Sequence, residues 1–352
     1  MTTLSSLRKP AQHLPARSVS LVRFSLLAPF VAELDARRLD PDRLMAAEGL
    51  GRGELVDTSL FVSSAVVHRL VEAAAAMADD RHLGWQVGAA LDLDGWIPFR
   101  RVAQRSQTAG ELLTRYIQST RGEASSVVHS LQIGANQSVF SQRRVVSPDI
   151  VPAQTDAFTA ALCLTLIRSA SGAAWTPDDV MVTVSSPAAL PVASLGMTVL
   201  AGDRDGPTIS FPTEWLYLPL AREDAAGQRV TVPGRPEVPL DLLEAVRQVL
   251  RQRLDEQRIP AARVAQLVGL SQRTLERRLN GLKTSIAAEL LHLRQQEASR
   301  RLAHTGESIA HIAQAVGYAD PTSFSRAFKQ WTGQSPSAYR LARDGSPAAR
   351  RT

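Results

Sequence analysis

The chain has 352 residues, of which 44% are hydrophobic and 21% charged, a composition typical of about two globular domains with sizeable cores. Its single cysteine, Cys163, excludes an internal disulfide and a metal site built from several cysteines, and fits a reducing compartment. We find no apolar run of the ~20 residues that cross a bilayer and no secretory-signal pattern, so we expect a cytoplasmic protein without membrane contact.

The positive charge of the chain is concentrated near its end. Residues 261–352 contain 14 Lys/Arg and 6 Asp/Glu, a net charge of +8, whereas the first 260 residues contain 26 basic and 28 acidic side chains, a net charge of −2. Such asymmetry suggests a polyanionic partner for the last quarter, although a solvated basic face is an equally good explanation from charge alone.

The first 220 residues predict mixed α and β structure. Apolar spacing predicts helices near 26–34, from Pro41, at 63–77 and at 108–120, the last capped by Thr108. A hairpin with strands at 126–133 and 138–146 follows, then a buried helix at 158–168 that contains Cys163 as an inert core thiol. Short strands are predicted at 180–185, 198–201 and 208–211.

A break in composition separates this unit from an all-α unit. Residues 223–240 are rich in Pro and Gly and have little periodic apolar content, which is typical of a stiff linker. We therefore expect an N-terminal domain over 1–222 and a helical domain over 241–343.

Two segments of the helical domain, about 262–279 and 308–329, have the same plan. A short amphipathic helix ends at a glycine, Gly269 or Gly317, where a positive φ is needed. An N-cap, Ser271 or Asp320, then begins the second helix, and Pro321 occupies the first position of the later one. This plan predicts two helix-turn-helix motifs, whose second helices lie in the major groove of DNA.

The outward faces of these second helices carry side chains that bind base edges or phosphates. They are Gln272, Arg273, Glu276 and Arg277 in the first motif and Thr322, Ser323, Ser325 and Arg326 in the second. Glu276 could accept from cytosine N4 or only orient Arg273 or Arg277. A helix predicted at 285–302 would span about 27 Å, enough to set both motifs into successive major grooves of one duplex, ~34 Å per turn.

The segments VAQLVGLSQRTLERRL (264–279) and SIAHIAQAVGYADPTSFSRAFKQWTGQSPSAYR (308–340) resemble the two readers of the AraC/XylS family of bacterial transcription regulators. By position, the resemblance implies base-facing roles for Arg273, Glu276 and Arg277, and for Thr322, Ser323 and Arg326. More loosely, HLGWQVG (82–88), TAGELL (108–113) and FPTEWLYLPL (211–220) are similar to the arabinose-binding-type N-terminal domain of one subgroup. That domain implies a sensor or dimerisation unit, and we do not infer arabinose itself.

The expected fold is thus an α+β N-terminal sensor/dimerisation domain followed by an all-α domain with two helix-turn-helix motifs joined by a long helix. Five aromatic residues could line an effector pocket, although core packing is their commoner role: Trp85, Trp96, Phe99, Trp215 and Tyr217. The histidines are scattered and no phosphate-loop or nucleophile-elbow motif is present, so we expect no metal, no cofactor and no enzyme.

The functional prediction is a sequence-specific regulator, an activator, that binds double-stranded promoter DNA under the control of a small-molecule effector. We expect a homodimer that contacts RNA polymerase. Two alternatives remain open: a non-specific architectural DNA-binding protein, and an enzyme whose helical tail is regulatory.

Overall fold

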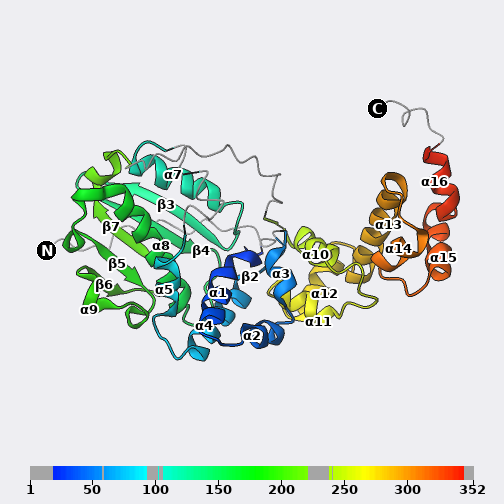
Figure 1. The fold of residues 1–352 in the computed structure, drawn as a ribbon, viewed down its shortest axis with the longest axis horizontal. Coiled ribbons are helices and arrows are strands. Elements are labelled where there is room, and N and C mark those ends of the chain that lie inside the picture. Colours follow the sequence, from blue (N-terminus) through cyan, green and yellow to red (C-terminus); the bar gives the residue numbers. More distant parts are fainter. Residues whose placement is uncertain are drawn as a thin grey trace.

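A computed structural model describes residues 19–57, 59–92, 102, 106–220, 238–239 and 241–344. In this part of the chain, no helix is long and apolar enough to cross a membrane. The described residues form an elongated molecule with the sheet at one end and the last helices at the other (Figure 1). The expected linker at 223–240 lies almost entirely outside the described residues.

The first part of the N-terminal domain is mainly helical. Residues Leu21–Arg23 (β1) pair antiparallel with Phe61–Ser63 (β2). The helices around this ribbon are η1 (Phe24–Leu27), α1 (Ala28–Ala36), α2 (Pro41–Ala47), α3 (Arg52–Val56), α4 (Ser64–Met77) and α5 (Leu83–Ala89). The N-caps of α2 and α4 explain their starts, because the side chains of Asp40 and Ser63 accept hydrogen bonds from the amides of Asp42 and Ala65.

The second part is a five-stranded mixed sheet in the order β3-β4-β7-β5-β6. The strands are β3 (Val127–Ile133), β4 (Gln137–Arg144), β5 (Met181–Val184), β6 (Thr198–Ala201) and β7 (Thr208–Pro212). The predicted hairpin is confirmed, with Val127 opposite Arg144 and Ile133 opposite Ser138. Only β5 and β6 run parallel; the other neighbouring strands are antiparallel.

Among the described residues, two long helices pack with the sheet to form its core. They are α7 (Ala109–Thr120) and α8 (Ala153–Ser171), which is longer than predicted. Thr108 caps α7 as expected, by accepting from the amide of Glu111. Cys163 is fully buried in α8, and burial raises the pKa of its thiol far above the ordinary value, as expected for an inert core group. Short elements complete this part: η2 (Gly172–Ala174), η3 (Pro177–Asp179), η4 (Pro187–Ala189), α9 (Val192–Leu195) and η5 (Thr213–Tyr217).

Helix α5 crosses α8 at very short range. A Cβ on Gly84 would lie 2.1 Å from the carbonyl oxygen of Gln154, and one on Gly88 would lie 2.5 Å from that of Phe158. No side chain fits in either place, so these two positions of the HLGWQVG segment require glycine. The crossing attaches the helical part of the domain to the sheet.

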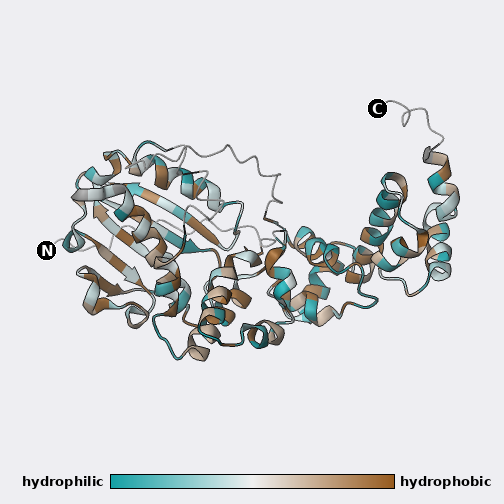
Figure 2. Ribbon diagram, viewed as in Figure 1, coloured by the Kyte–Doolittle hydropathy of each residue, from teal (hydrophilic) through white to brown (hydrophobic). Residues whose placement is uncertain are grey.

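The C-terminal helices are α10 (Leu242–Arg251), α11 (Ala261–Leu267), α12 (Gln272–Gly281), α13 (Ile286–His304), α14 (Ile309–Ala315), α15 (Pro321–Thr332) and α16 (Pro336–Asp344). Figure 2 shows bands of hydrophobic and hydrophilic residues along these helices, as expected for helices with one buried and one exposed face. The hydrophobic core under α14 and α15 is separate from that under α10–α12.

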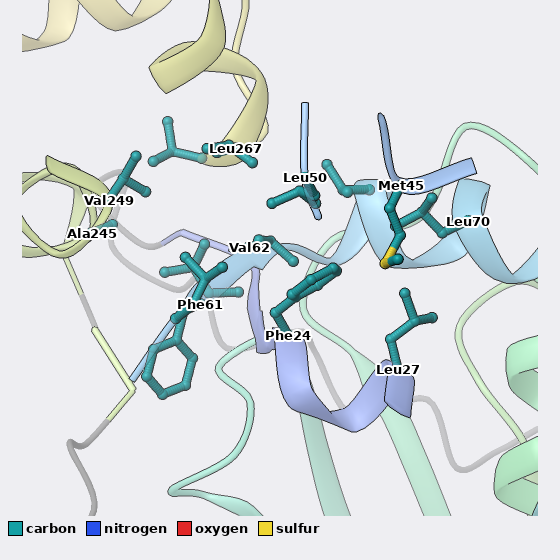
Figure 3. Close-up of a cluster of buried hydrophobic side chains, with 14 of the residues drawn as sticks. Phe24, Leu27, Met45, Leu50, Phe61, Val62, Leu70, Ala245, Val249 and Leu267 are labelled. Atoms are coloured by element: carbon teal, nitrogen blue, oxygen red, sulfur yellow. The ribbon is translucent and has the colours of Figure 1, made fainter. Parts of the chain in front are cut away.

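The hydrophobic packing does not follow the boundary that the sequence suggests. Helices α10 and α11 share one buried cluster with the N-terminal helices and β2. Figure 3 shows Phe61 and Val62 of β2 among Ala245, Val249 and Leu267 of α10 and α11. All five side chains are at most 2% exposed. The first helix-turn-helix motif is therefore packed onto the N-terminal domain, whereas the second extends away from it.

Candidate nucleic-acid interface

The first helix-turn-helix motif consists of α11, a tight turn and α12. Gly269 lies in the turn just after α11 and has a φ of +74°, as its position predicts. The Ser271 hydroxyl then accepts from the amide of Thr274, at 3.3 Å, and begins α12. Leu275 and Leu279 point into the core and are at most 1% exposed. The opposite face of α12 is left for solvent or for a partner.

The second motif repeats this construction with α14 and α15. Gly317 has φ +78°, and Asp320 accepts from the amides of Thr322 and Ser323 at 2.9 and 2.8 Å. These amide hydrogen bonds hold the pKa of the Asp320 carboxyl below its ordinary value. Pro321 is the first residue of α15, and Phe324 and Phe328 are fully buried beneath it.

The side chains predicted to contact DNA lie mostly on the exposed faces of these two helices. Gln272, Arg273, Glu276 and Arg277 are all exposed on α12. Thr322, Ser323 and Arg326 are exposed on α15. Ser325 differs, because it is half-buried and its hydroxyl donates to the carbonyl of Pro321 at 2.7 Å. Its hydroxyl is therefore occupied within the helix.

The arginines of the two exposed faces have no described acidic side chain in direct contact, although the charge of Arg326 acts on the nearby Asp320. Among the described residues, Arg273, Arg277 and Arg326 form no salt bridge. Arg300 and Arg301 of α13, by contrast, both bond to Glu297 at 2.7 Å. Glu276 accepts from the side-chain Nε2 of Gln272 at 2.8 Å and is not paired with Arg273 or Arg277. The free guanidinium groups thus lie where a polyanion would dock.

Helix α13 connects the two motifs as the predicted spacer. Its 19 residues span about 28 Å at ~1.5 Å per residue. The buried Glu289 near its start accepts from Arg247 of α10 at 2.7 Å and from Thr284 at 2.6 Å. Leu302 near its end lies in the core of the second motif. Since both ends of α13 are packed, the helix joins the two motifs rigidly.

Polar contacts tie α11 and the segment before it to the N-terminal domain. The buried Arg253 donates to Glu54, Arg263 donates to the carbonyl of Gly49 at 2.6 Å, and Gln266 donates to Glu48 at 2.7 Å. These partners are about 200 residues apart in sequence, so no local pattern predicts them. Burial lowers the pKa of the Arg253 guanidinium, although Glu54 opposes that shift.

The aromatic residues considered for an effector pocket are placed in or on the sheet domain. Trp215 is 2% exposed, with its ring centroid 5.4 Å from that of Trp175, so it belongs to the core. Trp85 is half-buried against the same core, and Tyr217 is 71% exposed. Trp96 and Phe99 lie outside the described residues. The three described aromatics do not line the cavity described next.

A cavity of about 670 Å³ lies between the helical part of the N-terminal domain and the sheet. Its walls come from η1, α1, α4 and α5 on one side, and from α7, α8, β3 and β4 on the other. Most of its lining is apolar, including Leu26, Phe30, Val71 and Leu162. Sequence reasoning missed it because its walls come from segments up to about 140 residues apart.

Two histidines at the edge of the cavity are held neutral. Burial, helped by the charge of Arg144, lowers the pKa of His68 to about 4, and burial lowers the pKa of His129 to about 4. His129 is held between Thr120 and Gln142 at 3.0 and 2.9 Å. Neither ring is charged at neutral pH.

Comparison with known families agrees with this geometry. Residues 264–342 match the model described as "Helix-turn-helix domain". Residues 39–220 match the model described as "Arabinose-binding domain of AraC transcription regulator, N-term". The second match covers more than half of the chain, and the two together cover both parts of the molecule. The chain belongs to the AraC family of transcription regulators, as its sequence motifs predict.

Curated relatives resemble only part of this chain. The transcriptional activator NphR of Rhodococcus sp. is 35% identical over 106 residues, which are 30% of this chain and 32% of that protein. The ornithine utilization regulator of Pseudomonas aeruginosa is 31% identical over 141 residues, 38% of this chain and 41% of that protein. The chain thus spans well under half the length of either relative. The solved transcriptional regulator CdpR of P. aeruginosa is 19% identical, with 90% of this chain and 98% of that chain covered and a TM-score of 0.41.

Proposed function

We propose that this chain is a sequence-specific DNA-binding transcription regulator, an activator, whose activity is controlled by a small-molecule effector. The observation that carries the proposal is the pair of capped helices, α12 and α15, with arginines on their outer faces that form no salt bridge with a described acid. A rigid spacer between two such helices suits successive major grooves of one duplex. NphR, the relative named as an activator, supports activation rather than repression.

In this mechanism, the helix N-termini and part of the arginines bind phosphates and fix the register of the protein on DNA. Arg273 on α12 and Arg326 on α15 read base edges in the groove, where a guanidinium pairs with the O6 and N7 atoms of guanine. Glu276, which is bonded to the side chain of Gln272 and to neither neighbouring arginine, accepts from cytosine N4.

A non-specific architectural protein would share the basic surface but not the base reading. The test compares binding of the purified full-length chain to its own promoter fragment and to scrambled DNA of equal length at fixed salt. We expect a ratio of dissociation constants well above tenfold; a ratio below tenfold would support the architectural alternative.

A single substitution separates base reading from phosphate binding at Arg273. Arg273→Ala should cost about 1–3 kcal/mol of binding free energy and relax the preference at one base position. If Arg273 contacts only phosphate, the loss will be the same on every sequence. Arg121→Ala, which removes an exposed arginine from the N-terminal domain, is the matched control and should change neither quantity.

The cavity between α4 and the sheet is our candidate effector site, and α4 is the element that connects it to the first helix-turn-helix motif. Val67, His68 and Val71 of α4 line the cavity. The residue that caps α4, Ser63, touches the turn of the first motif, since a Cβ on Gly269 would lie 2.2 Å from its hydroxyl. An effector that moves α4 would therefore move α12 and shift the population toward the DNA-binding arrangement.

We further propose that the chain acts as a homodimer through its N-terminal domain, contacts RNA polymerase when bound upstream of a promoter, and resides with the nucleoid in the cytoplasm. It has no catalytic role in this proposal. Sedimentation of the purified chain, with and without promoter DNA, tests the dimer.

A further inference from the structure

The chemical character of the cavity defines which molecule it can hold. Its apolar wall is built from η1, α1, α4, α5 and α8. Most of its polar side chains lie at the end formed by α7, β3, β4 and the start of α8, whereas Ser25, Glu33 and His68 belong to η1, α1 and α4. A ligand that fills this space must bury mostly apolar surface against the first wall and present its polar group to the second.

Three polar side chains at that end, Ser119, Thr120 and His129, are already hydrogen-bonded within the protein, whereas the buried Nε of Arg144 has no hydrogen-bond partner among the described residues. Thr120 donates to the carbonyl of Ile117 and contacts His129, whose other ring nitrogen contacts Gln142 at 2.9 Å. Ser119 donates to the carbonyl of Tyr116 at 2.8 Å. A sugar would bury several hydroxyl groups, each of which needs a partner, and these side chains offer few.

Most charges around the cavity are compensated in pairs. Arg144 is the only arginine or lysine among the described lining residues, and it is paired with the fully buried Asp156, although its Nε has no hydrogen-bond partner there. Of the three lining acids, Glu33 is paired with Arg37 and Glu123 with Arg23, each at 2.7 Å, and Asp92 also interacts within the protein. A carboxylate or phosphate in the cavity would meet only an arginine whose charge Asp156 already offsets, and burying such a charge is costly.

One ring nitrogen of His68 is left open where α4 meets the start of α8. His68 Nδ1 lies 3.2 Å from the Thr155 hydroxyl, while its Nε2 has no hydrogen-bond partner among the described residues. The ring is neutral, so it can exchange a single hydrogen bond with an uncharged group such as an amide, alcohol or lactone.

We propose that the cavity binds an uncharged, mainly apolar small molecule with one hydrogen-bonding head group placed near His68, and neither a free sugar nor a carboxylate. The inference rests on the proposed function, because it specifies the effector of that regulator. It differs from the sugar named in the description of the matching N-terminal domain.

The test uses the full-length chain and the uncharged dye Nile red, whose emission shifts to the blue in an apolar site. Two ligands of equal size compete with it at pH 7.5: 4-phenylbutanamide, which is uncharged, and 4-phenylbutanoate, which is ionised. L-arabinose is the third competitor. We expect displacement by the amide at concentrations at least tenfold lower than by the carboxylate, and none by arabinose.

Substitutions at two neighbouring residues of β3 test whether Nile red binds inside the cavity. Val127 lines the cavity, whereas Val128 points to the opposite face and is 49% exposed. Val127→Trp should abolish the blue shift and Val128→Trp should leave it intact, with circular dichroism as the check of folding. The competition in the unsubstituted chain does not depend on either variant.

The proposal is overturned if the folded chain does not bind Nile red, if arabinose or the carboxylate competes better than the amide, or if both tryptophan variants behave alike. Specific binding to the promoter fragment without these ligand results would leave the proposed DNA function intact and remove this inference. Ligand binding as predicted, without specific DNA binding, would support this inference and contradict the proposed DNA function.

Discussion

At the scale of single residues, Gly269 meets two independent requirements. Its φ of +74° favours glycine, and a Cβ there would lie 2.2 Å from the Ser63 hydroxyl across the interface with the N-terminal domain. Gly333 has a similar φ of +79° but open space around its Cβ position. Comparing the same substitution at the two glycines therefore distinguishes the cost of backbone strain from the cost of a steric clash.

We expect Gly333→Ala to reduce the free energy of unfolding by about 1 kcal/mol through backbone strain alone. Gly269→Ala should cost clearly more, because Ser63 must also move. Urea denaturation of both variants measures the difference. Equal losses would show that the contact between Ser63 and the turn is not important for stability.

The two buried histidines make stability depend on pH. In the unfolded chain each titrates near 6.5, whereas in the folded chain the pKa of His68 and of His129 is about 4. Between these values the unfolded state binds more protons, so stability falls as the pH is lowered from about 6.5 to about 4. Each ring contributes up to about 3 kcal/mol, at 1.36 kcal/mol per pKa unit.

Urea denaturation at several pH values between 7 and 4.5 checks this dependence. His129→Gln should weaken the loss of stability over that range, because only His68 then remains to be protonated on unfolding. His304→Gln, which removes an exposed histidine, should leave the slope unchanged. An unchanged slope in His129→Gln would contradict the assigned pKa of His129.

At the scale of helices and strands, the contact between domains depends on a few polar anchors around a shared hydrophobic core. The most buried of them is Arg253, whose side chain is 3% exposed and bonds to Glu54. Removing only the acid leaves a buried guanidinium with the more distant Glu256, 3.7 Å away, as its remaining partner.

We expect Glu54→Ala to cost about 3 kcal/mol in free energy of unfolding, since breaking a buried pair leaves a charge uncompensated. The matched control is Glu244→Ala on α10, which removes an exposed pair with Arg251 and should cost less than about 1 kcal/mol. Chemical denaturation measures both. Similar costs would mean that the Arg253–Glu54 pair is not a structural anchor.

The sequence predicts those elements whose causes are local. Gly269, Ser271, Gly317 and Asp320 set the two helix-turn-helix motifs through φ angles and caps that involve only neighbouring residues. The hairpin and the spacer α13 follow in the same way from periodicity. Ser325 lies on α15 as predicted, but its hydroxyl donates a hydrogen bond to the carbonyl of Pro321. A pattern of residue types does not show this bond.

The features that sequence does not predict are those that depend on distant partners. An apolar stripe on α10 shows that one face is buried, but not that β2, about 190 residues earlier, covers it. For the same reason, Trp215 is compatible with a core or a pocket until its neighbours are known, and the structure places it in the core. The cavity is assembled from segments that no motif connects.

At the scale of the whole molecule, the structure divides into three cores with different connections. The first motif is packed onto the N-terminal domain, and the second is joined to it through α13 (Figure 1). The effector cavity lies in the N-terminal domain, between its helical part and the sheet. In our account, an effector acts first on α12, and α15 follows because α13 joins the two motifs rigidly.

The central claim is that α12 and α15 read two separate blocks of one DNA site. The most direct measurement is selection of binding sequences from a random DNA pool with the full-length chain and with its Arg273→Ala and Arg326→Ala variants. We predict a motif of two blocks about one helical turn apart, in which each variant loses preference within a different block. A pool without an enriched motif, or two variants that alter the same block, would contradict the account.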